Sequence, residues 1–299
     1  MLHLRLLPLL LVPGFLFAQN KPKRRVNLPE SIREVSGMAI RHNSELWLLN
    51  DSHNPPQLFL TGRVSGRVFE ARTLPARNRD WEDLTVDPAG NLYIGDFGNN
   101  RNARHNLRIY RYNPDTGQLD SLLFRYPDQT AFPPASDHDW NFNCEAMVWL
   151  NDTLHLFSKN SFRGNFITKH YALPAGNAAF ASNGANHEVV AELRDSFLLR
   201  NRVVTGAALS RDGRTLALTA YIVQRKWGIF PHTRAEVYFF TGFSGSDFFH
   251  GKKSRRRLPK FMISRQFESV VHVRDEWWLV ANERHGQQKP AVWRIRKKR

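Results

Sequence analysis

The sequence predicts an all-β fold, a β-propeller of about five four-stranded blades, with six blades less favoured. Three observations support this prediction. A hairpin of two short apolar strands joined by a tight polar turn occurs five times along the chain. A third strand and usually a fourth follow each hairpin, which gives irregular repeats of about 45 to 63 residues. An additional strand candidate precedes the first hairpin, and it would complete the last unit.

The five hairpins supply the strands that we expect nearest the axis. Turns such as Asp-x-x-Gly and Asn-Asp provide the backbone freedom that a tight hairpin needs. The hairpins span residues 37–49, 83–94, 146–157, 206–218 and 269–280. A two-sheet sandwich would explain the alternation of side chains, but it would not explain five hairpins with matching starts. The propeller is therefore the favoured fold.

Outer strands complete the predicted blades. The third strands are expected at residues 57–60, 106–110, 167–171, 236–240 and 291–295. The fourth strands are expected at residues 67–70, 121–124, 187–190 and 261–263. The fifth hairpin has no fourth strand after it, so residues 24–28 are expected to fill that place and close the ring. Residues 127–143 and 224–234 are expected to be long loops, and the basic run 252–257 a solvated loop.

The N-terminus predicts export. Arg5 precedes an apolar run at residues 6–17, and the small residue Ala18 comes before a polar stretch, which is the pattern of a signal peptide cleaved after residue 18. The run is about a dozen residues long, whereas a bilayer crossing needs roughly 20. We therefore expect residues 19–299 to form a single monomeric propeller domain in the periplasm or outside the cell. Cys144 is the single cysteine, so a hydrophobic core, with no disulfide, must stabilise this domain.

The formal net charge of +16 raises the question of acidic partners. Much of the positive charge lies near residues 21–25, in the run 252–257 and at residues 294–299. No nucleic-acid-binding motif accompanies these clusters, and no segment after the N-terminus is apolar enough to span a membrane. The charge predicts long-range, salt-sensitive attraction to an acidic polymer or an envelope surface.

Acidic side chains recur at two equivalent places in the hairpins. One place lies just before or at the first strand, and the other lies just after the second strand. Because first strands line the axis of a propeller, we expect these side chains to meet at one mouth of the channel. The candidate ligand-binding residues are Glu34, Asp51, Glu82, Asp96, Asn99, Glu145, Lys159, Tyr221, Glu268 and Glu283. Thr205 replaces the acid in the fourth unit.

So many carboxylates in one place need a proton, a cationic partner or a metal. Lys159 would neutralise some of them, and Ca²⁺ is the candidate cofactor because it prefers several oxygen ligands. The candidate metal ligands are Asp51, Glu82, Asp96, Glu145 and Glu268. In the alternative interpretation, the acids accept hydrogen bonds from backbone N–H groups of neighbouring blades and only brace the ring. For the whole set, a ligand or cation site is favoured.

Four strings in these units are distinctive, namely Asp-Trp-Glu-Asp-Leu at 80–84, Gly-Asp-Phe-Gly-Asn at 95–99, Asn-Cys-Glu-Ala at 143–146 and Phe-Ser-Lys-Asn at 157–160. Together they resemble a group of exported bacterial propellers loosely similar to the SdiA-regulated, NHL-repeat and phytase-like families. The resemblance implies the propeller fold. Those families include binding proteins and calcium-dependent phosphoesterases. Thr205 and Tyr221 depart from a fully acidic, phytase-like metal cluster.

These features predict a ligand-binding or interaction module with a carboxylate-rich central channel that holds Ca²⁺. The alternative is a hydrolase, either a metal-dependent phosphoesterase or a glycoside hydrolase, that uses channel carboxylates. A structural propeller whose acids only brace the ring is the third hypothesis. The sequence has no Gly-x-Ser-x-Gly, phosphate-binding loop or His-Glu-x-x-His motif. Cys144 is expected to be a buried core residue.

Overall fold

The computed structural model describes residues 23–161, 164–180, 188–226, 230–258 and 266–297. Its strands form five sheets with four antiparallel strands each, and a parallel strand joins one of them. The first strand of each sheet contacts the first strands of its two neighbours, so the sheets form a closed ring around an axis. The predicted propeller of five four-stranded blades is therefore confirmed. The predicted signal peptide at 1–18 and strand at 261–263 lie outside the described residues.

The blades follow one another along the chain, and each begins with the strand nearest the axis and continues outward, although the rim strand of blade five comes from the N-terminus. Blade one contains β2 (Val35–Arg41), β3 (Glu45–Asn50), β4 (Gln57–Thr61) and β5 (Val68–Thr73). Blade two contains β6 (Trp81–Val86), β7 (Leu92–Asp96), β8 (Leu107–Tyr112) and β9 (Leu119–Arg125). Blade three contains β10 (Asn143–Leu150), β11 (Thr153–Lys159), β12 (Ile167–Pro174) and β14 (Glu192–Leu198).

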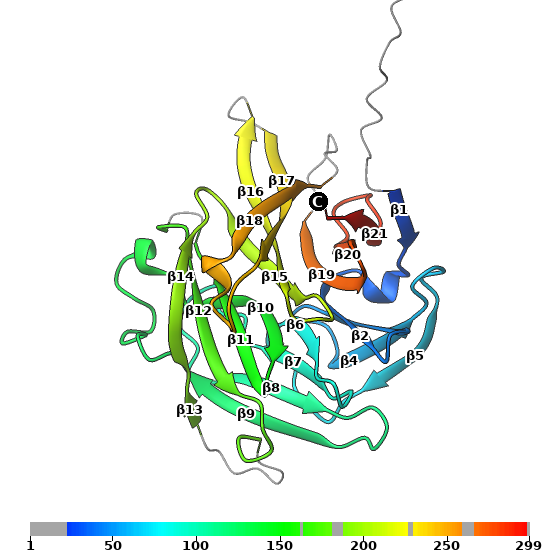
Figure 1. Ribbon diagram of the computed structural model, residues 1–299, viewed down its shortest axis with the longest axis horizontal. Helices are drawn as coiled ribbons and strands as arrows, with labels where there is room; N and C mark the ends of the chain where they lie inside the picture. Colours follow the sequence, from blue (N-terminus) through cyan, green and yellow to red (C-terminus); the bar gives the residue numbers. More distant parts are fainter. Residues whose placement is uncertain (1–22, 162–163, 181–187, 227–229, 259–265, 298–299) are drawn as a thin grey trace, which may run out of the picture.

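The last two blades complete the ring. Blade four contains β15 (Val203–Leu209), β16 (Thr215–Lys226), β17 (Phe230–Thr241) and β18 (Lys252–Arg257). Blade five contains β19 (Phe267–Arg274), β20 (Trp277–Asn282), β21 (Ala291–Arg296) and, at its rim, β1 (Lys23–Asn27). Figure 1 shows β1, in blue, beside β21, in red. The expected closure of the last blade by an N-terminal strand is thus confirmed.

Large apolar side chains fill the spaces between neighbouring blades. Trp47 of blade one and Trp81 of blade two are almost completely buried in one cluster. Phe239 of blade four and Trp278 of blade five pack with their ring centroids 5.4 Å apart. Cys144 is also buried, and burial raises the pKa of its thiol to about 12. It is therefore a core residue, as expected, and not an activated nucleophile.

One outer-strand prediction, the fourth strand of blade three, was wrong. The segment expected to be the fourth strand of blade three forms β13 (Glu188–Val190), which pairs in parallel with β9 of blade two. The fourth strand of blade three is β14, which begins two residues later. The outer edge of β9 offers backbone N–H and C=O groups that have no partner strand within blade two. β13 pairs with this edge, and the chain then continues into β14 of blade three. Local residue patterns do not encode which blade edge a passing segment will meet.

Two expected loops are strands of blade four. The basic run 252–257 forms the edge strand β18, and residues 224–226 and 230–234 extend the paired strands β16 and β17, while residues 227–229 lie outside the described residues. Figure 1 shows these paired strands, in yellow, extending beyond the neighbouring strands. A charged edge strand is common because lysine and arginine discourage edge-to-edge association. The high charge of the run concealed its strand character.

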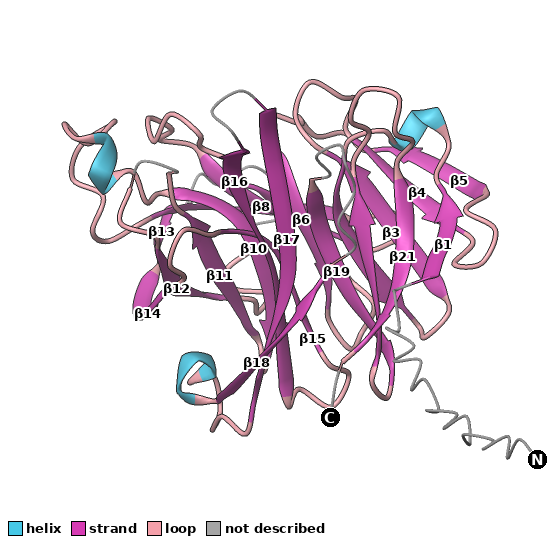
Figure 2. Cartoon of the chain, turned by 90° about the horizontal axis from the view of Figure 1, so that it is seen from above, coloured by secondary structure: helices cyan, strands magenta, loops and turns pink. Residues whose placement is uncertain are grey.

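Helical structure in the described residues is limited to short 3-10 turns. These are η1 (Glu30–Ile32), η2 (Asp137–Asp139) and η3 (Phe248–His250), and Figure 2 shows them in cyan outside the strands. Within the described part of the chain, no helix has the length and apolar character that a membrane crossing requires.

Candidate functional site

A β-bulge interrupts every first strand at the same level of the propeller. The pairing with the second strand skips one residue in each blade, and the skipped residues are Ser36, Glu82, Glu145, Thr205 and Glu268. A bulge bends its strand and redirects the side chain of the extra residue. Blades two, three and five thus present a carboxyl group at this level, whereas blades one and four present a hydroxyl group.

The bulges reveal two slips in the sequence-based register. The blade-one equivalent of Glu82 is Ser36, whereas Glu34 lies two residues earlier. In the second strands, the equivalents of Asp51 are Phe97, Lys159, Tyr221 and Glu283. Asp96 lies one residue before Phe97, and a slip of one residue moves a side chain to the other face of a strand.

A cavity of about 440 Å³ lies at the bulge end of the channel. Seven of the ten candidate residues line it, namely Asp51, Glu82, Glu145, Lys159, Tyr221, Glu268 and Glu283. The remaining lining includes amide and hydroxyl side chains such as Ser36, Asn100 and Asn143. The structure therefore brings together carboxylates from blades one, two, three and five, with Tyr221 supplied by blade four.

Glu34, Asp96 and Asn99 do not line this cavity. The Glu34 carboxylate is partly exposed and accepts a hydrogen bond from Asn54 at 2.5 Å. The Asp96 carboxylate forms an ion pair with Arg104 at 3.0 Å. The Asn99 side-chain oxygen accepts hydrogen bonds from the backbone N–H groups of residues 103 and 104. These three side chains organise the surrounding loops.

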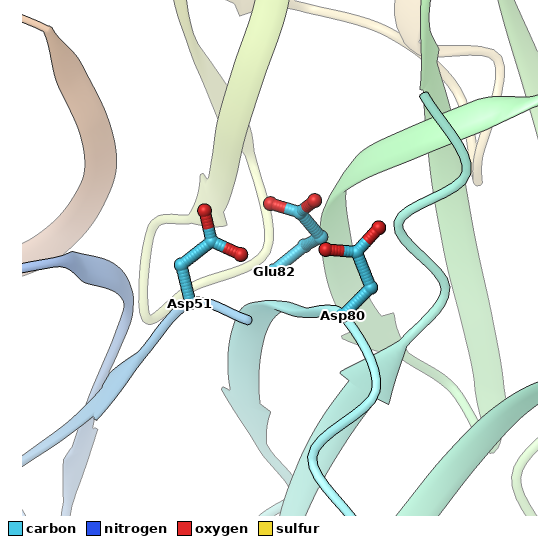
Figure 3. A group of neighbouring side chains, drawn as sticks. All are labelled: Asp51, Asp80 and Glu82. Carbon is cyan, nitrogen blue, oxygen red and sulfur yellow. The ribbon is translucent and has the colours of Figure 1, made fainter. Parts of the chain in front are cut away.

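Asp80 belongs to the site although the sequence did not single it out. One carboxylate oxygen each from Asp51, Asp80 and Glu82 can be chosen so that all three lie within 4.8 Å of one another. Figure 3 shows these carboxylates facing a common space, with Asp51 coming from blade one and the other two from blade two. Asp80 lies one residue before β6. The distinctive string 80–84 includes this aspartate, but the predicted site comprised acids at equivalent places in the hairpins, and Glu82 is the only acid of this string at such a place.

Two neighbours hold Asp80 in place. The Asp96 carboxylate accepts a hydrogen bond from the Asp80 backbone N–H at 3.0 Å. Gly98 passes so close that a Cβ atom there would collide with the carboxyl groups of Glu82 and Asp80. A side chain at residue 98 would therefore push the carboxyl groups of Glu82 and Asp80 out of their positions.

Burial raises the pKa of each carboxyl group in this trio. The pKa of Asp80 rises to about 6, and the nearby charge of Asp51 adds to the effect of burial. Burial also raises the pKa of Asp51 and holds that of Glu82 well above its ordinary value. The charge of Glu145 raises the pKa of Glu82 further. Ionising all three together is costly unless a cation is present.

Lys159 is the single cationic side chain among the described residues that line the cavity. Its ammonium group donates a hydrogen bond to Glu145 and lies 5.6 Å from the centroid of the Tyr221 ring. Burial alone would lower the pKa of Lys159, but Glu145 and the other acids raise it well above its ordinary value. Lys159 therefore stays charged and compensates at most one carboxylate.

Blade five contributes Glu268 and Glu283 to the cavity. Burial raises the pKa of Glu268 to about 8, although Lys159 acts against the rise. Burial and the charge of Glu268 hold the pKa of Glu283 well above its ordinary value. For Glu145, burial outweighs the effect of Lys159 and raises the pKa to about 7. These three carboxyl groups therefore favour their protonated forms at neutral pH more strongly than exposed glutamates do.

Other polar side chains brace the ring. Asp83, fully buried beside the bulge of β6, accepts backbone hydrogen bonds from Met147 of blade three at 2.7 Å and Ala207 of blade four at 3.3 Å. The Ser36 hydroxyl donates to a carbonyl of blade two, and the Thr205 hydroxyl to a carbonyl of blade five. Bracing and cavity lining are thus performed largely by different residues.

No protein-family model and no curated protein matches this sequence. Solved structures with a similar fold include virginiamycin B lyase from Staphylococcus aureus, with 15% identity, 91% coverage of this chain, 69% coverage of that chain and a TM-score of 0.40. A protein described as a candidate gluconolactonase has 12% identity and a TM-score of 0.43, and the match covers 88% of this chain and 74% of that chain.

A third structure is the extracellular domain of a hybrid two-component system from B. thetaiotaomicron. It has 11% identity and a TM-score of 0.35, and the match covers 87% of this chain and 27% of that one. The strand order and the closed ring of the described residues identify this chain as a five-bladed β-propeller.

Proposed function

We propose that this propeller is a ligand-binding module whose acidic cavity holds a hard divalent cation, with Ca²⁺ as the first candidate. The trio of Asp51, Asp80 and Glu82 carries the proposal. Two oxygens that each lie about 2.4 Å from a central Ca²⁺ are at most about 4.8 Å apart, and one oxygen from each member of the trio can be chosen within this limit. Calcium also prefers the oxygen ligands that carboxylates and amides supply.

The charge balance of the cavity supports the same proposal. Six carboxyl groups from Asp51, Asp80, Glu82, Glu145, Glu268 and Glu283 lie in or beside it, and Lys159 offers one positive charge. A divalent cation would replace protons on the trio and relieve repulsion between neighbouring acids. The bound ion would also present open positions to an anionic or oxygen-rich ligand in the cavity.

Calorimetric titration of metal-stripped protein with Ca²⁺, together with a melting scan, tests the proposal. We expect heat of binding and a higher melting temperature. The double variant D51N/D80N should weaken binding at least tenfold, whereas E188Q/E192Q should not, because Glu188 and Glu192 are exposed acids on the rim. The absence of both heat of binding and stabilisation in the wild-type protein would contradict the proposal.

The fold of the double variant can be checked independently. Burial raises the pKa of Asp51 and of Asp80, so both carboxylates oppose folding at neutral pH when no metal is present. The metal-free D51N/D80N protein should therefore be at least as stable as the metal-free wild type. A loss of Ca²⁺ binding then reports on the ligands and not on unfolding.

A hydrolase that uses the channel carboxylates is the second candidate function. The pKa values of Glu145, about 7, and Glu268, about 8, favour it. Carboxyl groups with such values carry a proton near neutral pH and can donate it to a leaving group. Generic phosphate-ester and glycoside substrates test this activity with and without Ca²⁺, and turnover that E268Q abolishes would favour the enzyme over the binding module.

We also propose that the basic rim of blade four contacts an acidic polymer of an envelope surface. Four guanidinium groups lie within 3.7 Å of the buried Glu236 carboxylate, namely those of Arg202, Arg234, Arg255 and Arg257. Four positive charges share one negative charge, so three remain to attract an anion. Binding to soluble polyphosphate should weaken with salt and with R255Q/R257Q, and salt-independent binding would contradict the proposal.

Export is a further proposal, and it rests on the sequence of residues 1–18. Mass spectrometry of the protein recovered outside the cytoplasm should give a chain that begins at Gln19. An uncleaved chain retained in the cytoplasm would contradict it.

A further inference from the structure

A second concave site lies at the opposite end of the strands, among the hairpin turns. Its volume is about 310 Å³. Blade one contributes Asn43 and Arg63, blade four contributes Arg211, and blade five contributes Arg274, Trp277 and Arg294 at the pocket wall. These arginines are far apart in the sequence, and the ring closure between blades one and five brings them together.

The pocket is strongly basic. Four guanidinium side chains line it, and no acidic side chain is among its described lining residues. Two of the three acids nearest in sequence have other partners. Asp212 accepts hydrogen bonds from the Ser210 hydroxyl at 2.5 Å and from a backbone N–H, and Glu276 lies 3.5 Å from the ammonium group of Lys297. The third acid, Asp275, is exposed at the turn beside Arg274. The four guanidinium charges of the pocket therefore outnumber the acids beside it.

Parts of the pocket are fixed before any ligand arrives. One Nη atom of Arg211 donates a hydrogen bond to the Val273 carbonyl at 3.0 Å. The Arg294 guanidinium carbon lies 4.5 Å from the centroid of the Trp277 ring, so these two side chains hold each other in a cation–π contact. A site with anchored donors loses less side-chain entropy when it binds its ligand.

We propose that this basic pocket binds a small phosphate-bearing molecule. Guanidinium groups donate two parallel hydrogen bonds to phosphate oxygens, and several of them around one cavity match a polyphosphorylated or diphosphate group. The volume lies at the lower end of the range for small-molecule sites, which favours a free phosphorylated metabolite over a polymer. The Trp277 ring offers an apolar wall for the remainder of such a ligand. This site is separate from the acidic cavity and does not depend on Ca²⁺.

Titration with pyrophosphate at low ionic strength tests the proposal. The readouts are calorimetry and tryptophan fluorescence, because Trp277 lines the pocket. The double variant R63Q/R274Q should weaken binding at least tenfold. Both side chains are exposed or half-exposed, so the variant should fold, and circular dichroism checks this. The control R77Q/R101Q removes the same charge at exposed positions away from this pocket and from the basic rim of blade four, and it should leave the affinity unchanged.

Three results would overturn the proposal. One is the absence of pyrophosphate binding by the folded wild-type protein. Another is an equal loss of affinity in R63Q/R274Q and R77Q/R101Q, which would show binding to the net charge alone. The third is binding to phosphatidylglycerol vesicles without binding to free pyrophosphate, which would identify a membrane surface as the partner. If D51N/D80N loses Ca²⁺ binding but keeps pyrophosphate binding, the two sites are independent.

Discussion

The isosteric replacement E268Q is expected to stabilise the metal-free protein at pH 8 much more than at pH 5. Burial raises the pKa of Glu268 from its ordinary value of 4.5 to about 8. Between these two values the folded protein binds more protons at this site than the unfolded chain does. The wild-type protein therefore loses stability as the pH rises through this window, whereas glutamine, which never ionises, does not.

The size of the effect follows from the two pKa values. One pH unit corresponds to about 1.4 kcal/mol, so the carboxyl group costs the folded state about 4 kcal/mol at pH 8 and about 1 kcal/mol at pH 5. The gain in unfolding free energy from E268Q should then be about 3 kcal/mol larger at pH 8 than at pH 5. Urea unfolding with a chelator present, at constant ionic strength, measures this difference.

A matched control is available on the rim of blade three. Glu192 is exposed and its partner, Arg194, lies on the surface, so E192Q should change the stability little at either pH. The reasoning is refuted if E268Q changes the stability equally at both pH values, or if it destabilises the protein at pH 8. Addition of Ca²⁺ at pH 8 should reduce the advantage of E268Q, because the cation relieves the same repulsion.

Three further predictions concern buried polar groups. D83N should lower the unfolding free energy by about 2 to 4 kcal/mol in urea unfolding, because both carboxylate oxygens accept backbone hydrogen bonds and an amide N–H₂ would face an N–H donor in either orientation. K159M should destabilise the protein at neutral pH by about 3 kcal/mol because it leaves Glu145 without its cation, and E145Q should rescue much of this loss in a double-mutant cycle. H170Q should make stability less sensitive to acid, because burial lowers the pKa of His170 to about 3 and that of His155 to about 4. For the histidines, the unfolded chain binds protons below about pH 6.5 while the folded pair stays neutral, so wild-type stability should fall relative to H170Q between pH 6.5 and 4.

Each of these three predictions has an outcome that would contradict it. Unchanged stability of D83N would show that Asp83 does not brace the blades. For Lys159, simple additivity in the double-mutant cycle would show that the ion pair contributes no coupling energy. Parallel curves of stability against pH for the wild type and H170Q would show that the buried histidine does not oppose folding in acid.

The sequence by itself determined the blade count and the closure of the ring. Both depend on local signals, because a hairpin is defined by its own turn and by alternating residues close together in the chain. The strand at the N-terminus and the missing fourth strand of blade five could be matched without knowledge of distant contacts. The equivalent positions of Glu82, Glu145 and Glu268 were also recognisable, since each follows the same kind of buried residue at the start of a first strand.

Tertiary structure decided which side chains enter the cavity. The structural register places Ser36, two residues after Glu34, and Phe97, one residue after Asp96, in the equivalent positions, while Asp80 joins the acids. A shift of one residue exchanges the two faces of a strand, and a linear sequence carries no mark of where the bulge will form. Neighbouring acids in one string consequently took opposite roles.

Contacts between blades were likewise beyond the sequence. The segment at β13 paired with blade two, the basic run became the edge strand β18, and arginines from three blades met around one pocket. Each outcome depends on which chain segments the closed ring places side by side, whatever their separation in the sequence. The sequence thus determined the repeating unit, because its forces are local, and the fold decided the sites, because they form where separate units meet.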